Sequence, residues 1–338
     1  MKKLLVGIFL FHSLFSYAQK GDMTTVLSDI TEKVKSYYID PTTYKKVDSL
    51  FQSELKKGTF NNLNKKDFAA LLTQKLRKDI KDGHFFVKYL ENYSPEKLVD
   101  EKEKVKLNNF HNSLENFGFE SVRRLEGNIG YINFKGFASP EASAATLAAA
   151  MNFVANTNSL IIDLRENGGG ENDMLLLFCS YFFDKKTDLY TTYLRHANKT
   201  VMNSTQSNVS GTKYLHKKVY ILTSEISFSA AEALAYFLQQ HKLAEVIGEK
   251  TEGTANPVDH FIIQNEYLLL VPAGKITSLS SHTNWEHIGV MPDQEVKAEY
   301  ALKTAHSKAL KNILKTEKET KTELSIPEIK NLINKLEQ

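Results

Sequence analysis

Ser229 occupies the position in this sequence that best suits a nucleophile. It follows an apolar run, Val219–Thr223, that predicts a strand, and it precedes Ala230–Gln240, which predicts a helix. Backbone N–H groups point outward at a helix N-terminus, where the helix dipole favours negative charge. An oxyanion beside Ser229 could therefore accept a hydrogen bond from the Ala230 N–H. The spacing from Ser229 to Glu232 also fits a capping box, which would involve no chemistry.

A glycine-rich turn, Asp163–Gly170, lies between a second predicted strand, Ser159–Leu164, and a helix at Met174–Phe183. Glycines let a backbone approach a ligand closely and present N–H groups to an anion. The turn could form one wall of an oxyanion hole, or it could be a plain connection between strand and helix. Its spacing fits neither of the usual nucleotide-binding glycine patterns, so we do not expect a nucleotide.

Two further segments contain groups that could activate a serine. His84 lies in Asp82-Gly83-His84-Phe85, and a neutral histidine can take a proton from a serine near pH 7. The chain has 10 histidines, so this segment alone decides nothing. Glu286 lies in Asn284–Asp293, beside the one tryptophan, and a carboxylate there could orient a histidine. By itself this second segment is a loop around a buried Trp.

Taken together and in order, these segments resemble peptidase family S41. The resemblance extends from Leu125 to Val296. It rests on an opening strand, a D-L-R-x-N-x-G-G signature, a nucleophile segment and the strand-turn after it, which are Gly127–Tyr131, Asp163–Gly170, Ser227–Glu232 and Gly248–Gly253. The family implies an α/β fold with a ClpP/crotonase-like spiral of strands and helices.

The family has two catalytic forms, and the turn after the nucleophile separates them. One form pairs the serine with a lysine in a G-K turn, but here the turn is Gly253-Thr254. The other form is similar to tricorn-type proteases and the interphotoreceptor retinoid-binding repeats. It has a histidine in a D-G-H segment and a glutamate in a W-E-x-x-G-V-x-P-D segment, and both segments are present here. Its members often carry G-A-H-P where this chain has Thr254-Ala255-Asn256-Pro257, a departure that could alter the substrate pocket.

The resemblance therefore implies a serine peptidase with a Ser-His-Glu triad. His84 would deprotonate Ser229, and Glu286 would hold the imidazole tautomer and stabilise its charged form. No metal or cofactor is implied. The expected oxyanion donors are the backbone N–H groups of Gly169 or Gly170 and of Ala230. A rival is a non-catalytic binding protein for apolar ligands or peptides on the same fold, and a decayed, purely structural site is a third possibility.

The elements around these motifs suggest four regions. We expect a signal peptide at 1–18, an N-terminal helical bundle with its connector at 19–124, a catalytic core at 125–300, and a helical tail at 301–338. Apolar residues recur at helical spacing in 26–38, 47–55 and 67–80, and strands alternate with helices from about 128 to 250. The connector, in which we expect a short helix near Phe110–Phe117, is too short for the PDZ domain of tail-specific family members.

Composition limits the partners. The chain has 338 residues, of which 42% are hydrophobic and 25% charged, as is ordinary for a globular protein. Its net charge of +3 falls to +1 without Lys2 and Lys3, so charge gives no case for nucleic acid or an acidic membrane surface. We expect a peptide or protein substrate, and the oligomeric state stays open. The one cysteine, Cys179, lies in an apolar helix and is expected to be a small core residue.

The N-terminus has the features of an export signal. Lys2 and Lys3 precede an apolar run, Leu4–Phe15, and Ser16-Tyr17-Ala18 supplies small residues at the positions that a signal peptidase inspects. The run is short for a membrane span, although an uncleaved anchor is the alternative. We therefore expect a periplasmic or secreted protein that has no membrane segment after cleavage.

Cleavage before Gln19 is the first testable expectation. Protein recovered from the cell envelope or medium of a bacterial host should begin at Gln19 by intact-mass spectrometry. Retention of Met1 on membrane-bound material would instead identify an anchor.

Overall fold

The computed structural model describes residues 23–93, 101–316 and 321–338, which form two compact units. Unit 1 contains the described residues up to 93, with Tyr193–Thr200 and Asn256–Lys275. Unit 2 contains residues 101–192, Val201–Ala255 and the described residues from Ile276 onward. The expected signal peptide lies outside the described residues. Among the helices that are described, none is long and apolar enough to cross a membrane.

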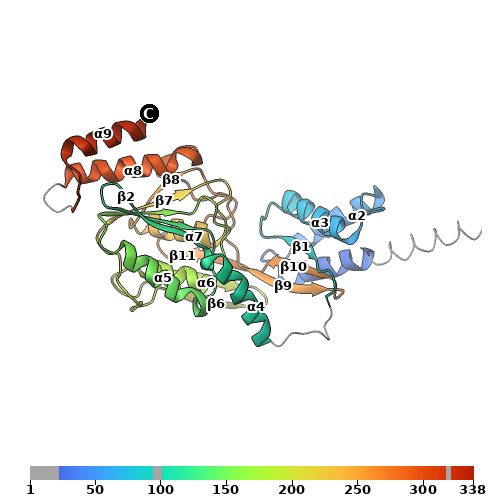
Figure 1. Ribbon diagram of the computed structural model, residues 1–338. Coiled ribbons are helices and arrows are strands. Elements are labelled where there is room, and N and C mark those ends of the chain that lie inside the picture. Colours follow the sequence, from blue (N-terminus) through green and yellow to red (C-terminus); the bar gives the residue numbers. More distant parts are fainter. Residues whose placement is uncertain (1–22, 94–100, 317–320) are drawn as a thin grey trace, which may run out of the picture. The chain divides into compact units, whose positions relative to one another are not determined.

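Unit 1 combines helices with a small antiparallel sheet (Figure 1). Its helices are residues 23–37, α2 (Thr43–Lys56) and α3 (Lys65–Ile80), and its sheet has the order β1 (Phe86–Tyr89), β10 (Tyr267–Pro272), β9 (Val258–Ile263). The buried face of the helices includes Phe51, Phe68 and Leu72. These side chains pack in one cluster with Leu269 and Val271 of β10.

This arrangement differs from the predicted boundaries 19–124 and 125–300. The N-terminal helices are present as expected, but β9 and β10 belong to the same unit as the helices. The reason is burial: the apolar residues of β10 alternate along the strand, and those on one face complete the core under the helices. β1, which lies within the region expected to be helical, pairs with β10 from Phe86↔Leu270 to Tyr89↔Tyr267.

Unit 2 is built on a six-stranded sheet of order β12-β8-β7-β4-β3-β2. All neighbours are parallel except β2, which runs antiparallel to β3. The expected α/β class is therefore confirmed. The strands, from first to last in the chain, are β2 (Phe119–Leu125), β3 (Ile129–Phe134), β4 (Ser159–Asp163), β7 (Lys218–Thr223), β8 (Glu245–Gly248) and β12 (Gln294–Glu295).

Helices cover both faces of this sheet, which explains why its central strands are apolar runs. α5 (Pro140–Val154), α6 (Asn172–Ser180) and α7 (Ala230–Gln240) cover one face, while α8 (Ala298–Lys315) and α9 (Ile326–Glu337) lie on the other (Figure 1). In β4, Leu160 and Ile162 pack in the cluster with α5, α6 and α7. Ile161, which points the opposite way, packs with α8 and α9.

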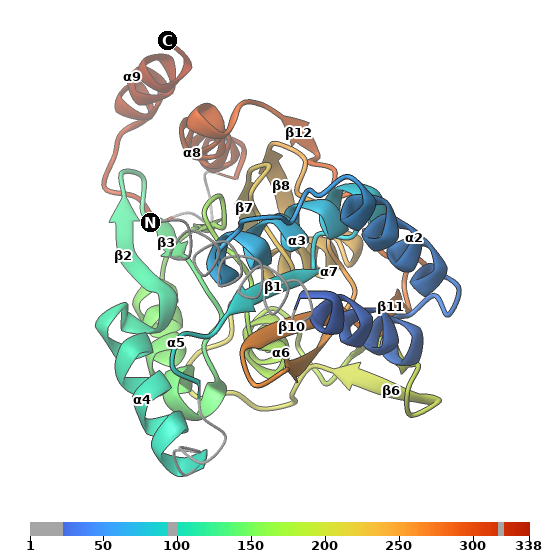
Figure 2. The same ribbon diagram turned by 90° about the vertical axis from the view of Figure 1, so that its right-hand side faces the viewer.

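The remaining elements are β5 (Asp188–Leu194), β6 (Lys199–Ser204) and β11 (Gly274–Ser278), which form a sheet of order β11-β5-β6, and the edge helices α4 (Glu101–Leu114) and η2 (Asn116–Gly118). α4 begins well before the short helix expected at Phe110–Phe117. Figure 2 shows α4 leading toward β2. The boundaries between the two units fall within β5, β6 and β11.

The parallel order brings the motif segments to one edge of the sheet. The segments that follow β3, β4, β7 and β8 all start at the carboxyl ends of their strands, where open α/β sheets bind ligands. This edge carries the glycine turn after β4 and Ser229 after β7. Strand order therefore brings two of the predicted motif segments, the glycine turn and the Ser229 segment, to the same edge.

A buried carboxylate, Glu232, ties the Ser229 segment to the turn after β8. It is fully buried in the first turn of α7 and accepts five hydrogen bonds. One oxygen accepts the Ser229 N–H at 2.8 Å and both the N–H and the hydroxyl of Thr254, at 3.0 and 2.6 Å. The other accepts the Thr251 hydroxyl at 2.6 Å and the Gly253 N–H at 2.7 Å. Burial raises the pKa of Glu232, although these hydrogen bonds act in the opposite direction.

Glu232→Gln should therefore destabilise the protein although it preserves shape. The amide nitrogen of glutamine would face N–H and O–H donors, and each buried donor left unsatisfied costs about 1–3 kcal/mol. We expect a loss of about 3 kcal/mol in the free energy of unfolding, measured by urea denaturation. Glu225→Gln, at an exposed carboxylate in the same segment, is the matched control and should stay within about 0.5 kcal/mol of wild type. Equal stability of the two variants would refute the role given to Glu232.

Candidate functional site

Ser229 is held in a backbone conformation that side chains rarely adopt. It is the N-cap of α7, with φ 54° and ψ −115°. A non-glycine residue at positive φ outside the usual left-handed well costs about 1–3 kcal/mol, and such strain concentrates at functional sites. The Glu232 carboxylate and, at 3.3 Å, the Thr254 hydroxyl both accept the Ser229 N–H. The capping geometry left open by the sequence is thus present in its Glu232 half, and it coexists with a strained serine.

Gly169 packs directly against this serine. It has φ 86°, and a Cβ built on it would lie 2.8 Å from the Ser229 Cβ and 3.0 Å from the Ala230 nitrogen. Real Cβ atoms do not approach so closely, so the turn after β4 can reach Ser229 because this position lacks a side chain. The structure therefore brings the glycine turn and the proposed nucleophile together.

Asn167 sets the orientation of the glycine turn. It is fully buried, donates from Nδ2 to the Phe134 carbonyl at 2.8 Å, and accepts the Gly169 N–H on Oδ1 at 2.8 Å. Its own carbonyl accepts the Phe228 N–H. The Gly169 N–H is thus occupied. Among the described residues, no acceptor is bound to the N–H of Gly170 or of Ala230, the two other predicted oxyanion donors.

Asp163 and Arg165, which open the signature, form a structural clamp. Arg165 donates from Nε and Nη2 to the two carboxylate oxygens of Asp163, at 2.8 and 2.6 Å, and Tyr131 donates to the same carboxylate at 2.7 Å. The third contact of Arg165 is to the carbonyl of Ala298, at the start of α8. Because both oxygens of the Asp163 carboxylate bind Arg165, we assign this carboxylate a structural role in positioning the glycine turn.

Glu286 lies in a loop that is pinned to the turn beside Ser229. Its Oε2 accepts the Ala255 N–H at 2.7 Å, and Oε1 lies 3.5 Å from the His287 Nδ1. The buried Trp285 donates from its indole nitrogen to the Thr254 carbonyl at 3.2 Å. Since the Thr254 hydroxyl also accepts the Ser229 N–H, two adjacent residues, Thr254 and Ala255, connect Ser229 to Glu286.

His84 belongs to unit 1, in the turn between α3 and β1. It is buried, and its backbone N–H donates to Asp82 Oδ1 at 3.0 Å, while Tyr38 donates to the other oxygen of that carboxylate. Burial, together with the nearby Arg77, lowers the pKa of His84 to about 4. The imidazole is therefore neutral at pH 7, as a general base must be. Its pairing with Ser229, a residue of unit 2, stays a prediction.

Two other reactive side chains lie in settings that do not favour catalysis. Lys250 is exposed, whereas a lysine base needs burial to lower its pKa. Cys179 is fully buried in α6, and burial raises the pKa of its thiol, so it is a core residue as expected.

Sequence reasoning missed the supporting residues of the site. Asn167 was part of a quoted signature but received no role, and Glu232 was considered only as a helix cap. Thr254 was noted for the lysine that it replaces, not for its hydroxyl. The signal available for Asn167 was its place directly before three glycines, and that for Glu232 was a single charge in an alanine-rich apolar helix.

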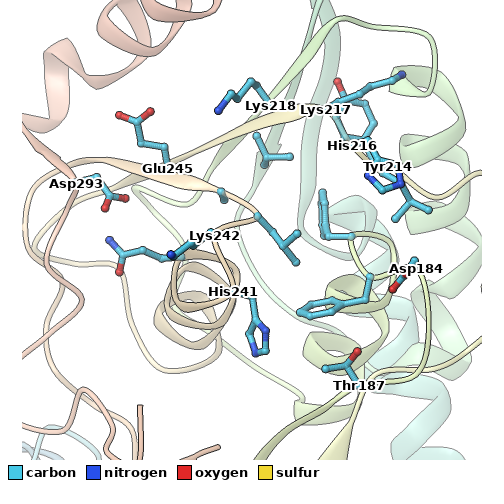
Figure 3. Close-up of a pocket in the computed structure, with 17 residues that line it drawn as sticks. Asp184, Thr187, Tyr214, His216, Lys217, Lys218, His241, Lys242, Glu245 and Asp293 are labelled. Atoms are coloured by element: carbon cyan, nitrogen blue, oxygen red, sulfur yellow. The ribbon is translucent and has the colours of Figure 1, made fainter. Parts of the chain in front are cut away.

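Figure 3 shows a different hollow of unit 2, with a volume of about 830 Å³. Its lining includes Lys218 at the start of β7, Glu245 at the start of β8, and His241 after the last turn of α7. It therefore lies at the amino ends of the parallel strands, on the edge opposite Ser229. Of the motif residues discussed above, only Asp293, the last residue of the segment Asn284–Asp293, lines this hollow.

Relatives named as carboxyl-terminal-processing peptidases match about half of the chain. The chain is 28% identical over 165 residues to carboxyl-terminal-processing peptidase 2 of Arabidopsis thaliana, covering 49% of this chain and 31% of that protein. It is 25% identical over 176 residues to the carboxyl-terminal-processing protease of a Picosynechococcus species, covering 51% of this chain and 40% of the relative. The chain thus spans less than half the length of these curated relatives.

Solved structures share the fold at low sequence identity. A lipoprotein from Streptococcus agalactiae aligns with a TM-score of 0.57 at 17% identity, over 85% of this chain and 96% of that one. The tricorn protease aligns with a TM-score of 0.53 at 13% identity, over 93% of this chain and 37% of that one. The model of peptidase family S41 matches residues 128–296, half of the chain, which include the glycine turn, Ser229 and Glu286. This chain belongs to peptidase family S41.

Proposed function

We propose that the protein is an exported serine peptidase in which Ser229 attacks the peptide carbonyl. The observation that carries the proposal is the strained Ser229 at the start of α7, packed against Gly169. A serine that served only as a cap would not need a positive φ, nor a glycine loop against its Cβ. Both features cost free energy that a catalytic role explains.

His84 is the proposed general base and Glu286 the residue that orients it. The imidazole is kept neutral by burial, so it can take the Ser229 proton and later deliver it to the leaving amine. The Ala255 N–H donates to one oxygen of Glu286, and this hydrogen bond positions the carboxylate before substrate binds. The negative charge of Glu286 would stabilise the imidazolium formed in the transition state.

The oxyanion donors follow from the hydrogen-bond pattern. Because Asn167 occupies the Gly169 N–H, we assign the donors to Gly170 and Ala230. Gly169 then acts through its missing side chain. Ala230 is at the first position of α7, where the helix dipole adds to its hydrogen bond. A donor of this kind is worth roughly 3 kcal/mol of transition-state stabilisation.

Substrate and location are inferred from the relatives and the N-terminus. The curated relatives are named as carboxyl-terminal-processing peptidases, which supports peptide or protein substrates. The residues before Gln19 support export to the periplasm or the medium.

The nucleophile is tested with a fluorophosphonate probe. Wild type should be labelled, with the modification mapped to Ser229 by mass spectrometry, because a base-activated serine beside an oxyanion hole attacks phosphorus. Ser229→Ala should not be labelled, and Ser227→Ala, a buried neighbour that donates to the Leu164 carbonyl, controls for other serines of the segment. A folded wild type that stays unlabelled beside a reactive control peptidase would favour the binding-protein alternative.

The base is tested by four single variants and a pH profile. His84→Ala should lower kcat by about 10⁴–10⁶-fold, as the loss of a triad member does. Glu286→Gln should lower kcat substantially with little change in KM, since it acts on the base. Lys250→Ala should keep most activity. His287→Ala is the matched control, because His287 also adjoins Glu286 but is half exposed.

The pH profile of kcat/KM gives an independent readout. Because the pKa of His84 is lowered to about 4, activity should persist well below pH 6.5 and fall as pH decreases through about 4. If Lys250→Ala lost peptidase activity while His84→Ala kept it, the proposed triad would be refuted and the family assignment would stand. A dead His287→Ala beside an active His84→Ala would move the base to His287.

A further inference from the structure

We propose that an amide-lined groove beside the glycine turn binds an extended, internal segment of peptide substrate through its backbone. The inference rests on the proposed function, and it names where that substrate lies. The groove has a volume of about 480 Å³ and lies within unit 2. It is bounded by α4, by the segment Lys135–Ser139 after β3, and by Gly169 and Glu171 of the glycine turn.

The groove leads to the nucleophile. Gly169 lines it and also packs against Ser229, so a chain lying in the groove passes the serine at that end. The segment after β3 is held against the glycine turn by two backbone hydrogen bonds, from the Phe137 N–H to the Gly169 carbonyl at 2.9 Å and from the Glu171 N–H to the Phe137 carbonyl at 2.8 Å. One wall of the groove is therefore fixed relative to the proposed oxyanion donors.

α4 presents mainly amides to the groove. Asn109 and Asn112 are half-buried and line the groove together with Asn108 and with one apolar side chain, Val105. The other large apolar residues of the helix do not line it: Leu107, Phe110 and Leu114 are 53%, 57% and 68% exposed. If burial of apolar side chains set the orientation of α4, Leu107, Phe110 and Leu114 would face the rest of unit 2 instead of solvent. The observed orientation is therefore explained better by a partner for the amides.

The chemistry of this lining matches a peptide backbone. A side-chain amide donates and accepts, as a peptide group does, and among the described residues the side chains of Asn108, Asn109 and Asn112 have no hydrogen-bond partner. Asn108 and Asn112 are separated by four residues, which is about 6 Å along a helix. Backbone groups that face the same way in an extended chain recur about every 6.8 Å. The two amides thus match the two-residue repeat of a strand.

The charges around the groove favour an internal segment over a chain end. Lys135 is paired with Glu166, while Glu115 and Glu171 are exposed at the lining. A free carboxylate would meet these two glutamates without a free cation from Lys135. The opposite wall contains Gly136, where an added Cβ would meet only the Gly169 carbonyl, at 3.7 Å. That wall is open to a backbone.

The test measures binding in the Ser229→Ala background, so that it does not depend on catalysis. The probe is a fluorescein-labelled decapeptide of alternating threonine and alanine with an amidated C-terminus, followed by fluorescence anisotropy. Asn108→Leu with Asn112→Leu should raise Kd by about tenfold or more, since two hydrogen bonds are lost. Gly136→Leu, which places a side chain at the open wall, should weaken binding similarly. Lys106→Ala, on the exposed side of α4, is the control and should not change Kd.

A second probe tests the backbone itself. The same peptide N-methylated at alternate residues cannot donate along one edge, and it should bind at least tenfold more weakly to the parent protein. Unchanged Kd in both groove variants, equal binding of the methylated peptide, or no binding of the parent probe at millimolar concentration would each overturn the proposal. Thermal unfolding of every variant checks that α4 and the core are intact. Fluorophosphonate labelling of wild type reports separately on the proposed function, so the two can fail independently.

Discussion

A carboxylate surrounded by donors holds the candidate site together. Glu232 is buried where its charge would be costly, and that cost is offset by dipoles that converge from two segments, the residue before α7 and the turn from Thr251 to Thr254. Each dipole belongs to a group that the site needs in place. The amide of Ser229 is fixed by it, and so is the turn from Thr251 to Thr254. Because Trp285 is bonded to that turn, the loop carrying Glu286 is fixed in consequence.

The sequence predicted best those elements whose apolar pattern reflects burial on both sides. β4 and β7 are short apolar runs followed by motif residues, and both lie in the centre of the large sheet. β5 and β6 carry mixed polar residues and were not predicted, since their burial does not follow a clear alternation. α4 was misplaced for a related reason: its apolar residues are exposed, so the pattern does not mark a buried face.

The chemical groups of the site could be predicted, but their hydrogen bonds could not. Ser229 was predicted beside a glycine turn because both follow parallel strands, and such strands end at one edge. That Asn167 accepts the Gly169 N–H, on which the proposed assignment of an oxyanion donor to Gly170 rests, depends on a side-chain conformation. Four of the five bonds to Glu232 come from a turn about twenty residues later. Local spacing carries no information about either contact.

Unit 1 is assembled from segments made at different times during synthesis. Its helices are complete when the ribosome reaches Ile80, but their core lacks Leu269 and Val271 until the chain has passed β10. The nascent helices must therefore keep an apolar face uncovered while the strands of unit 2 are being made, a state prone to aggregation. A fragment ending before β9 would lack Ile263, Tyr267, Leu269 and Val271 of that core, so in unit 1 the core is completed only late in synthesis.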